Sequence, residues 1–514
     1  MYRNRLVSFR FVTVLMFAIL AISGLGFSIY MIYIANSLYM YALAISFTIL
    51  AVIAGFFNVT ASVWYYRSFL YKDYLKKITK KLEPVKTFPT VAIAVPVYNE
   101  DPKHVKSNML RLMKLKYPED KLRYYLLDDS TKTEVTSELK SFARNHNIVY
   151  IHRESRQGFK AGALNNFLKH SSEKLIAIFD YDEYLVDTNF LLDLLPYFND
   201  KKLSYIQTTK KYAKGSFFSD SVELFNAFFF RFIQPARALD NTAIFAGSCG
   251  LISRDAIESV GGFPEFVIED TFFSFESDMH DFKSLYIPKV YALGRPLKTF
   301  TELMRQQWRY NYGNTQFIGY FFKKSKKLRR FTTLTSMDYI THGFSLNYLS
   351  FVLVLFTIVS MLIAFSTVPF VSLTITEFMQ SKYLPLDFEA FGVLAFLLSF
   401  IMPIILTRVY FKSIRKGFMI FMLNYALAII RTKAALAALF NKGAASIRWS
   451  RDIDPNKSRL LFSIYNTKVE LIFTGILVAL GIYAININHV PGGVWLLWYG
   501  IMYSCATILF YKYG

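Results

Sequence analysis

The stretch TVAIAVPVYNE at residues 90–100 indicates the fold of the soluble part of the chain. Its first half is a short apolar run, 90–95, and polar residues follow at once in 98–100. A short apolar run bounded by turn residues is typical of a strand that is buried on both faces. We therefore expect the first strand of a sheet here, with polar side chains directly after its carboxyl end.

Three further runs of this kind follow, and polar, periodic segments separate them: 124–127, 148–151 and 175–179. Strands that alternate with helices indicate a doubly wound α/β fold with a parallel sheet. In that architecture ligands bind at the carboxyl ends of the strands. The block from Arg67 to His342 is expected to form this domain, with its site at the strand ends.

Acidic residues follow three of the four runs. Glu100 comes after the first, Asp128 and Asp129 after the second, and Asp180 and Asp182 after the fourth. Paired carboxylates are costly there unless a cation lies between them, and oxygen ligands alone suit Mg²⁺ or Mn²⁺, which also bridge phosphates. One Asp would be explained as a helix cap. Three clusters at successive strand ends favour a nucleotide and metal site.

The segment RQGFKAGALN at 156–165 places glycines and Lys160 at an expected helix start. Backbone N–H groups and a cation can both contact a diphosphate there. The segment is neither a Walker loop nor a GxGxxG fingerprint, which disfavours ATPases and dehydrogenases. Cys249 and Cys505 are far apart and the seven histidines are scattered, so a disulfide framework and a Cys or His metal site are excluded.

The remainder of the chain has the composition of a membrane protein. Of the 514 residues 54% are hydrophobic, and the mean hydropathy is +0.29. Residues 11–66 carry no charge, and one helix of that length would measure about 84 Å, against about 30 Å for a hydrocarbon core. We expect two spans there, near 11–34 and 39–65; a cleaved signal peptide is the alternative.

Uncharged runs return at 343–376 and 390–407, and polar residues at 486–493 divide the run 471–511 in two, which makes six expected spans. The run 417–430 is too short for a span and continues into Arg431, so it predicts a helix at the membrane interface. The alternative is that 417–440 also crosses the bilayer.

The distribution of charge predicts the topology. Twelve Lys and Arg residues lie between Arg408 and Lys468, whereas the connection 371–389 carries one lysine against three acids. The positive-inside rule therefore places both termini and the soluble block in the cytoplasm. The expected parts are two spans (1–66), the cytosolic domain (67–342), two spans (343–410), an interfacial helix with a basic loop (411–467) and two spans (468–514).

Seven short motifs occur in order: PVYNE (96–100), LLDDST (126–131), RQGFKAGALN (156–165), IFDYDE (178–183), FAGSCGLISR (245–254), VIEDTF (267–272) and RQQWRYNYGNTQ (305–316). They resemble the motif series of membrane-embedded, processive family-2 glycosyltransferases, the synthases of cellulose, chitin, hyaluronan and mannans. LLDDST, the KAGAL run and the paired glutamines are most similar to β-mannan and glucomannan synthases. The resemblance implies a Rossmann-like GT-A domain inserted between about six transmembrane helices, with an additional interfacial helix.

The resemblance also implies a role for each matching residue. Asp270 would be the general base, in a pair with Glu269, and Arg309 would stabilise the leaving diphosphate; the alternative for Asp270 is a helix N-cap. Asp182 would hold Mg²⁺ or Mn²⁺. The implied donor and nucleotide residues are Tyr98, Glu100, Asp128, Asp129, Lys160 and Asp180. The implied acceptor residues are Phe245, Gly247, Ser248, Gln306, Gln307, Trp308 and Tyr310.

Two departures from the family pattern concern the acceptor and the nucleotide. The family's QxxRW motif ends in tryptophan, and this chain has Tyr310 there, so the aromatic surface under the terminal sugar is smaller. The segment RWSR at 448–451 is only weakly similar to the family's gating loop, which closes over the nucleotide.

The sequence thus predicts an inverting, metal-dependent hexosyltransferase of the plasma membrane that uses a UDP- or GDP-hexose to elongate a β-linked polysaccharide. Its expected partners are the nucleotide-sugar donor, the glycan acceptor and product, and the lipid bilayer. Two alternatives remain: a non-processive transferase acting on a lipid-phosphate carrier, and a nucleotide-sensing transporter or channel, which the uncharged spans disfavour. Nucleic-acid binding is not expected, because much of the +22 net charge lies in membrane-proximal loops.

Overall fold

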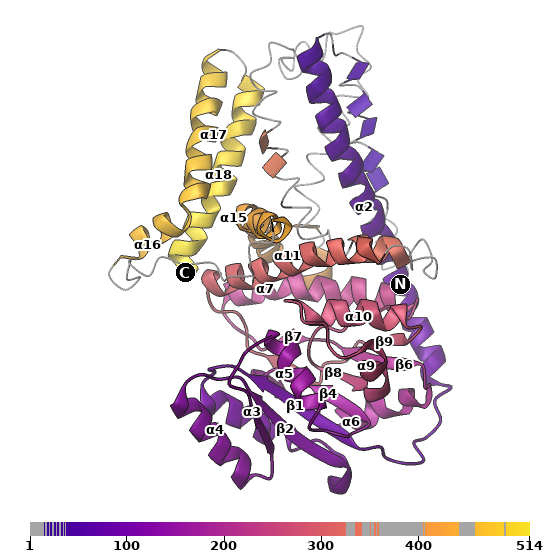
Figure 1. The fold of residues 1–514 in the computed structure, drawn as a ribbon. Helices are drawn as coiled ribbons and strands as arrows, with labels where there is room; N and C mark the ends of the chain where they lie inside the picture. The colour runs from indigo at the N-terminus through magenta and orange to yellow at the C-terminus, as the bar shows by residue number, and fades with distance from the viewer. Residues whose placement is uncertain are drawn as a thin grey trace.

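The computed structural model describes residues 37–324, 335–341, 407–440, 458–487 and 490–514, with scattered positions at 15–35, 350–358 and 404–405. An α/β domain lies at one end of the molecule (Figure 1). Three long helices extend away from it: α2 (Leu38–Thr79), α17 (Lys468–Asn486) and α18 (Val490–Tyr513). Two more lie crosswise between these helices and the domain: α11 (Phe300–Lys323) and α15 (Ile414–Leu439).

The domain is built on a seven-stranded sheet with the order β3-β2-β1-β4-β8-β6-β9. Its strands are β1 (Val91–Val97), β2 (Leu122–Asp128), β3 (Val149–His152), β4 (Leu175–Ile178), β6 (Leu203–Thr208), β8 (Gly250–Ser253) and β9 (Lys283–Ile287). The first four are parallel neighbours, which confirms the four predicted strands. A smaller sheet, β5-β10-β7, consists of β5 (Glu183–Leu185), β10 (Ala292–Gly294) and β7 (Lys211–Tyr212).

The expectation of a parallel sheet is confirmed for β1 to β4 but does not hold at β8, which runs antiparallel to both β4 and β6. The cause is the path of the preceding segment. Cys249 donates its backbone N–H to the carbonyl of Ile178, the last residue of β4, so the chain enters β8 from the carboxyl edge of the parallel strands. This path also brings residues 246–248 to the edge where the predicted site lies.

Helices cover both faces of the sheet, because alternate residues of a strand point to opposite sides. Ile93 and Val95 pack with residues of α3 (Pro102–Leu112), α4 (Thr133–Asn145) and α6 (Phe190–Leu194). Ala92 and Ala94 pack with residues of α5 (Phe159–Leu168), α9 (Arg254–Val260) and α10 (Glu269–Met279). The remaining helices of the domain are η1 (Glu119–Lys121), η2 (Leu195–Asn199), α7 (Phe217–Phe228), η3 (Phe229–Ile233) and α8 (Gln234–Ala238).

Helix α2 continues beyond the predicted span 39–65 and enters the domain. Trp64 and Tyr65 are buried, and Tyr71 belongs to the apolar core on one face of the sheet. The Tyr71 hydroxyl donates to the backbone carbonyl of Tyr286 on β9. One unbroken helix thus joins the apolar amino-terminal segment to the sheet.

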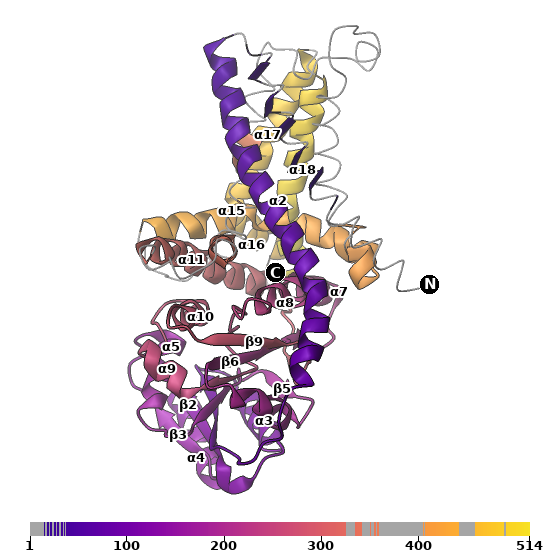
Figure 2. The same ribbon diagram turned by 90° about the vertical axis from the view of Figure 1, so that its right-hand side faces the viewer.

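Four described helical segments are long and apolar enough to cross a membrane: Ala44–Thr79, Ile414–Leu439, Lys468–Asn486 and Gly493–Tyr513. The second of these, α15, differs in direction. Figure 1 looks along α15, and Figure 2 shows it crosswise to α2, α17 and α18. A short helix, α16 (Arg459–Asn466), precedes α17. The predicted spans 11–34, 343–376 and 390–407, the connection 371–389 and the loop 441–457 lie wholly or mostly outside the described residues.

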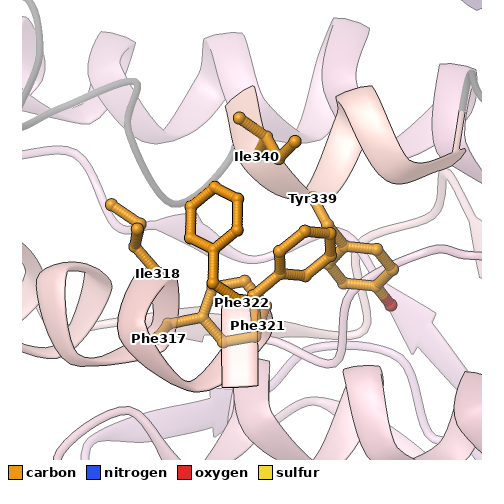
Figure 3. A pocket seen from close by; sticks show the side chains of 6 residues that line it. All are labelled: Phe317, Ile318, Phe321, Phe322, Tyr339 and Ile340. Atoms are coloured by element: carbon orange, nitrogen blue, oxygen red, sulfur yellow. The ribbon is translucent and has the colours of Figure 1, made fainter. Parts of the chain in front are cut away.

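The helical residues 335–341 pack on the carboxyl-terminal half of α11. An apolar pocket lies between them (Figure 3), lined by Phe317, Ile318, Phe321, Phe322, Tyr339 and Ile340. The Tyr339 hydroxyl donates to Asp278 near the end of α10, and Trp64 Nε1 of α2 donates to Asp338 Oδ1 at 2.8 Å. These contacts join α2, α10, α11 and residues 335–341 into one packed unit.

Candidate active site

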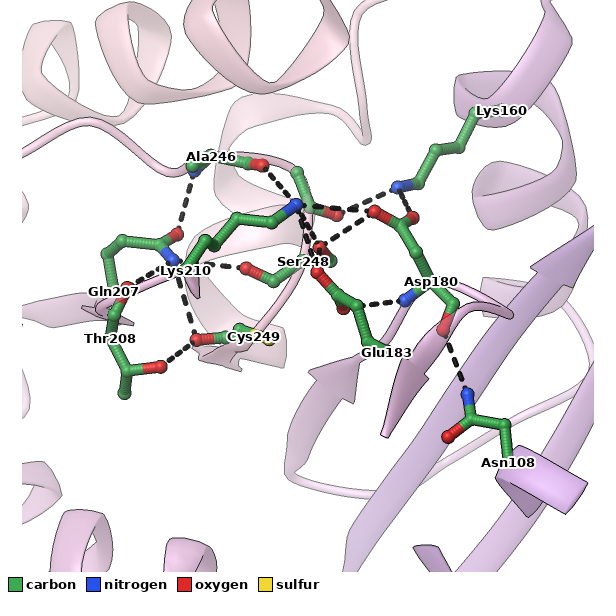
Figure 4. Close-up of polar contacts among 11 residues, drawn as sticks. Asn108, Lys160, Asp180, Glu183, Gln207, Thr208, Lys210, Ala246, Ser248 and Cys249 are labelled. Atoms are coloured by element: carbon green, nitrogen blue, oxygen red, sulfur yellow. Dashed lines mark hydrogen bonds and ion pairs between the residues drawn. The ribbon is translucent and has the colours of Figure 1, made fainter. Parts of the chain in front are cut away.

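Asp180 lies at the carboxyl end of β4 between two lysines (Figure 4). Its Oδ1 is 2.6 Å from Lys160 Nζ, and its Oδ2 is 3.3 Å from Lys210 Nζ. Lys160 is in the first turn of α5, directly after Gly158 and Phe159, and the φ of +72° at Gly158 favours glycine. Lys210 follows β6. Two strand ends and one helix start therefore converge on a single carboxylate.

Ser248 and Glu183 complete this cluster. Ser248 Oγ lies 2.8 Å from Asp180 Oδ2 and 2.7 Å from Glu183 Oε1, and Lys210 Nζ contacts both Ser248 and Glu183. Burial alone would raise the pKa of Asp180, but Lys160 and Lys210 outweigh it and hold this pKa below its ordinary value. Asp180 is therefore ionised at neutral pH.

Asp182 is half-buried and, in the described part of the chain, has no salt bridge. Burial, together with the neighbouring Asp180 and Glu183, raises the pKa of Asp182 to about 7. Within the described ranges, no three His, Cys, Asp or Glu side chains converge to enclose an ion. Mg²⁺ needs only one or two protein carboxylates when phosphate oxygens and water complete its shell. Asp182 therefore fits the role of a metal ligand that acts together with a bound diphosphate.

Glu269 and Asp270 begin α10 on the other side of this cluster. A methyl group at Gly247 would lie 3.1 Å from Asp270 Oδ2 and 3.7 Å from Lys160 Nζ, which places Asp270 beside the lysine. The Glu269 side chain is buried, and Asp270 is more accessible. Burial raises the pKa of Asp270; burial and the neighbouring Asp270 raise the pKa of Glu269 to about 7. This pair can accept a proton next to the predicted diphosphate site.

The predicted nucleoside residues lie at the ends of β1 and β2. Asp128 Oδ2 accepts a hydrogen bond from the Tyr150 hydroxyl at 2.6 Å. Tyr98 is exposed, and the guanidinium carbon of Arg156 lies 3.4 Å from the centre of its ring. Burial raises the pKa of Glu100. The structure brings these side chains to one edge of the sheet, next to the loop that precedes Lys160.

Arg153 connects this edge to the lysine. Its Nε donates to Asp129 Oδ1 at 2.7 Å, and its terminal nitrogens donate to the carbonyls of Gln157 and Phe159 at 3.0 Å each. Asp129 is thus paired with a guanidinium that also orders the turn before α5. The position of Lys160 depends on this contact.

Helix α11 divides the predicted acceptor residues between two sides. Tyr310 packs against the apolar cluster that includes Ile268, the residue before Glu269. Burial raises the pKa of Tyr310, and the charges of Arg309, Lys210 and Asp270 also act on it. Arg309 is exposed and Gln306 is half-buried. Tyr310 is therefore a predicted acceptor residue of α11 that lies near the start of α10.

Four other predicted acceptor residues have side chains that make contacts within the protein. Gln307 and Trp308 turn towards α15: Gln307 Oε1 accepts from Arg431 Nε at 2.9 Å, and Trp308 packs beside the apolar residues of that helix. Phe245 packs in the sheet core against Tyr205 and Phe273, and Ser248 is fully buried in the Asp180 cluster. The cause is the tight path of the chain into β8 and the helical spacing of α11, which turns neighbouring residues to different sides.

Sequence reasoning missed Lys210, Glu183 and Arg153. Lys210 follows the run 203–208, which is as short and as buried as the strands that were predicted. Arg153 directly follows β3, and Glu183 directly follows the predicted Asp182. Considering cations as well as acids at every strand end would have found Lys210 and Arg153.

Comparison with known proteins agrees with this geometry. Residues 92–261 match the model of glycosyl transferase family 2. The matched region is about a third of the chain and is similar to that family. The sheet that it contributes to is GT-A-like, and the match agrees with the resemblance seen in the motifs.

Two curated relatives are named as a cellulose synthase subunit and a probable glucomannan mannosyltransferase. The cellulose synthase catalytic subunit of Pseudomonas fluorescens is 28% identical over 243 residues, which are 46% of this chain and 32% of that protein. The probable glucomannan 4-beta-mannosyltransferase 7 of Oryza sativa subsp. japonica is 30% identical over 244 residues, 44% of this chain and 40% of that protein. The alignment thus spans roughly a third of the length of these relatives. A solved mannosyltransferase from Pyrobaculum calidifontis is 17% identical, covering 67% of this chain and 98% of its own, with a TM-score of 0.45.

Proposed function

We propose that this chain is an inverting, metal-dependent hexosyltransferase that uses a UDP- or GDP-hexose to elongate a β-linked polysaccharide. The observation that carries the proposal is the meeting of two groups at one edge of the sheet: Lys160, Asp180 and Asp182 on one side, and Glu269 and Asp270 on the other. The first group suits an anionic diphosphate with its cation, and the second suits a hydroxyl that loses its proton. The family match and the names of the relatives support the same reaction class.

On the donor side, Lys160 and Arg309 bind the diphosphate, and Lys210 keeps Asp180 in place. Asp182 would hold Mg²⁺ or Mn²⁺, which supplies positive charge to the leaving diphosphate. The nucleoside lies against the ends of β1 and β2, where Tyr98, Glu100, Asp128 and Asp129 border it.

On the acceptor side, Asp270 takes the proton of the attacking hydroxyl. The hydroxyl oxygen forms a bond to the anomeric carbon while the bond from that carbon to the diphosphate breaks. Because attack comes from the face opposite the leaving group, an α-linked donor gives a β-linked product. The raised pKa of Asp270 makes it a stronger base than a solvated carboxylate.

The membrane part gives the product a route. We place the enzyme in the plasma membrane, with the catalytic domain and both termini in the cytoplasm, and the growing glycan passes through the transmembrane helices. The excess of positive charge between Arg408 and Lys468 and the direct connection of α2 to the sheet support this placement. A polar polymer needs such a passage because it cannot cross lipid unaided.

The test is a donor screen with the full-length protein in liposomes. UDP- and GDP-hexoses are supplied with Mg²⁺ or Mn²⁺, and both nucleotide release and product length are followed; Asp182→Asn is the matched inactive variant. Release that depends on metal, with a product of many sugars, supports the proposal. A product with one added sugar on a lipid phosphate would replace it with the lipid-carrier transferase, and nucleotide binding without turnover would replace it with a sensor.

A further inference from the structure

Arg431 lies late in α15, and its side chain points into the protein. It is 1% exposed, its Nε donates to Gln307 Oε1 on α11 at 2.9 Å, and its Nη1 is 3.4 Å from Asn424 Oδ1 on its own helix. Gln307 is also buried. A buried charge-assisted hydrogen bond of this kind is costly to break, since water cannot reach the groups that lose it. The contact therefore holds α15 and α11 in one relative position.

Helix α11 connects this contact to the catalytic acids. It lies between α15 and α10 in both views (Figures 1 and 2). On the α10 side, a methyl group at Gly313 would lie only 2.7 Å from Ile268, the residue before Glu269. Tyr310, one turn earlier, packs against the same cluster. Since α11 is one continuous helix, any rotation at Gln307 also moves Tyr310 relative to Asp270.

We propose that Arg431 is a positioning residue for the transfer step: through Gln307 it sets the rotation of α11, and thereby the place of Tyr310 relative to the start of α10. The inference rests on the proposed function. Arg431 contacts the side of α11 that faces α15, so it acts on the acceptor geometry through Gln307. The donor contacts of Lys160 and Asp182 arise from other elements and do not depend on it. Arg309 is on α11, but its side chain is exposed and long enough to reach the diphosphate after a small rotation of the helix.

The first test compares Arg431→Met with Arg415→Met in the full-length protein in liposomes. Arg415 is an exposed arginine near the start of the same helix, so its variant removes the same charge without the buried contact. We expect Arg431→Met to bind the nucleoside diphosphate of the active donor within about twofold of the wild type, while transfer falls about 10- to 100-fold. The share of donor lost to hydrolysis should rise. Arg415→Met should match the wild type in all three measurements.

The second test asks whether Arg431 acts through Gln307. If it does, the double variant with Gln307→Met should transfer no more slowly than Gln307→Met alone. Arg431→Lys keeps a buried hydrogen-bond donor, so it should transfer faster than Arg431→Met. This variant also tests the inference if Arg431→Met does not fold. Three results would each overturn the inference. The rate losses of Arg431→Met and Gln307→Met could multiply in the double variant, Arg431→Met could transfer at the wild-type rate, or it could lose nucleotide binding as much as transfer. A wild type that turns over no donor would instead overturn the proposed function.

Discussion

At Asp182, a proton and a divalent ion compete for one carboxylate. Burial and the neighbouring Asp180 and Glu183 raise its pKa to about 7, so the group is largely protonated below that pH. We expect the affinity for Mn²⁺ to rise about tenfold per pH unit up to pH 7 and then to level off. Calorimetric titration of the protein with MnCl₂ in the presence of UDP or GDP, between pH 5.5 and 8.5 and against a nucleotide-only blank, measures this. Asp182→Asn should bind weakly at every pH, and a wild-type affinity independent of pH would remove Asp182 as the ligand.

We expect different results from substitutions of Asp270 and Glu269, the two acids at the start of α10. Asp270→Asn keeps the shape of the side chain but loses its basicity, so transfer should fall by about 10²- to 10⁴-fold while the donor still binds. Glu269→Gln should cost less, because the buried Glu269 side chain lies behind the more accessible Asp270. Single-turnover transfer and nucleotide affinity are measured together. A loss of binding equal to the loss of rate in Asp270→Asn would indicate a helix cap instead of a base.

Helix α11 carries Tyr310, the residue to which we assign the separation of elongation from hydrolysis. An aromatic face under the terminal sugar contributes stacking of about 1 kcal/mol, by analogy with aromatic pairs. Tyr310→Ala should therefore shorten the product sharply while donor hydrolysis persists, and Tyr310→Trp should lengthen it or leave it unchanged. Gel sizing of radiolabelled product checks both. Arg309→Ala should stop hydrolysis and elongation together, since its guanidinium is assigned to the diphosphate; persistent hydrolysis in that variant would contradict the assignment.

Helix α10 ends in a buried acid whose ionisation opposes folding. Burial raises the pKa of Asp278 to about 8, although the hydrogen bond from Tyr339 and the charge of Arg237 act to lower it. In the unfolded chain the group titrates near pH 4, so the folded protein holds an extra proton between about pH 4 and 8. Stability should therefore fall as the pH rises through this window. Melting temperatures from pH 5 to 9 should decline less steeply in Asp278→Asn than in the wild type; equal slopes would contradict the prediction.

The strands of the domain were predictable, and several side-chain directions were not. Each of the four predicted strands is a short apolar run, and the acids that follow three of them reach the same edge because parallel strands share direction. Phe245 and Trp308 lie in motifs that resemble the family, but a motif does not show which side of a tight turn or a helix a ring occupies. Lys210 was missed because the partner that explains it, Asp180, is thirty residues away in the sequence.

At the scale of the whole molecule, labelling the two ends of α15 tests whether this helix lies at the membrane interface or spans the bilayer. A helix that lies across the others, as Figures 1 and 2 show, has both ends on one side of the membrane, whereas a spanning helix has them on opposite sides. Single cysteines at Arg415 and Phe440, both exposed, should react alike with an impermeant maleimide in sealed vesicles of either orientation. The native Cys249 and Cys505 are buried and add little background. Labelling of the two positions from opposite sides would mean that α15 spans.

The unbroken course of α2 has a mechanical consequence. A helix of 42 residues is about 63 Å long, roughly twice the thickness of the hydrocarbon layer. Near its carboxyl-terminal end, Tyr71 is hydrogen-bonded to β9 and packs in the core of the domain. No break in α2 separates its apolar segment from the part that packs on the sheet. The orientation of the domain is therefore fixed relative to α2, and under the proposed function each sugar would be added at a constant distance from the membrane plane. Inserting two glycines between Tyr66 and Leu70 would make the orientation of the domain variable without changing any residue that we assign to substrate binding.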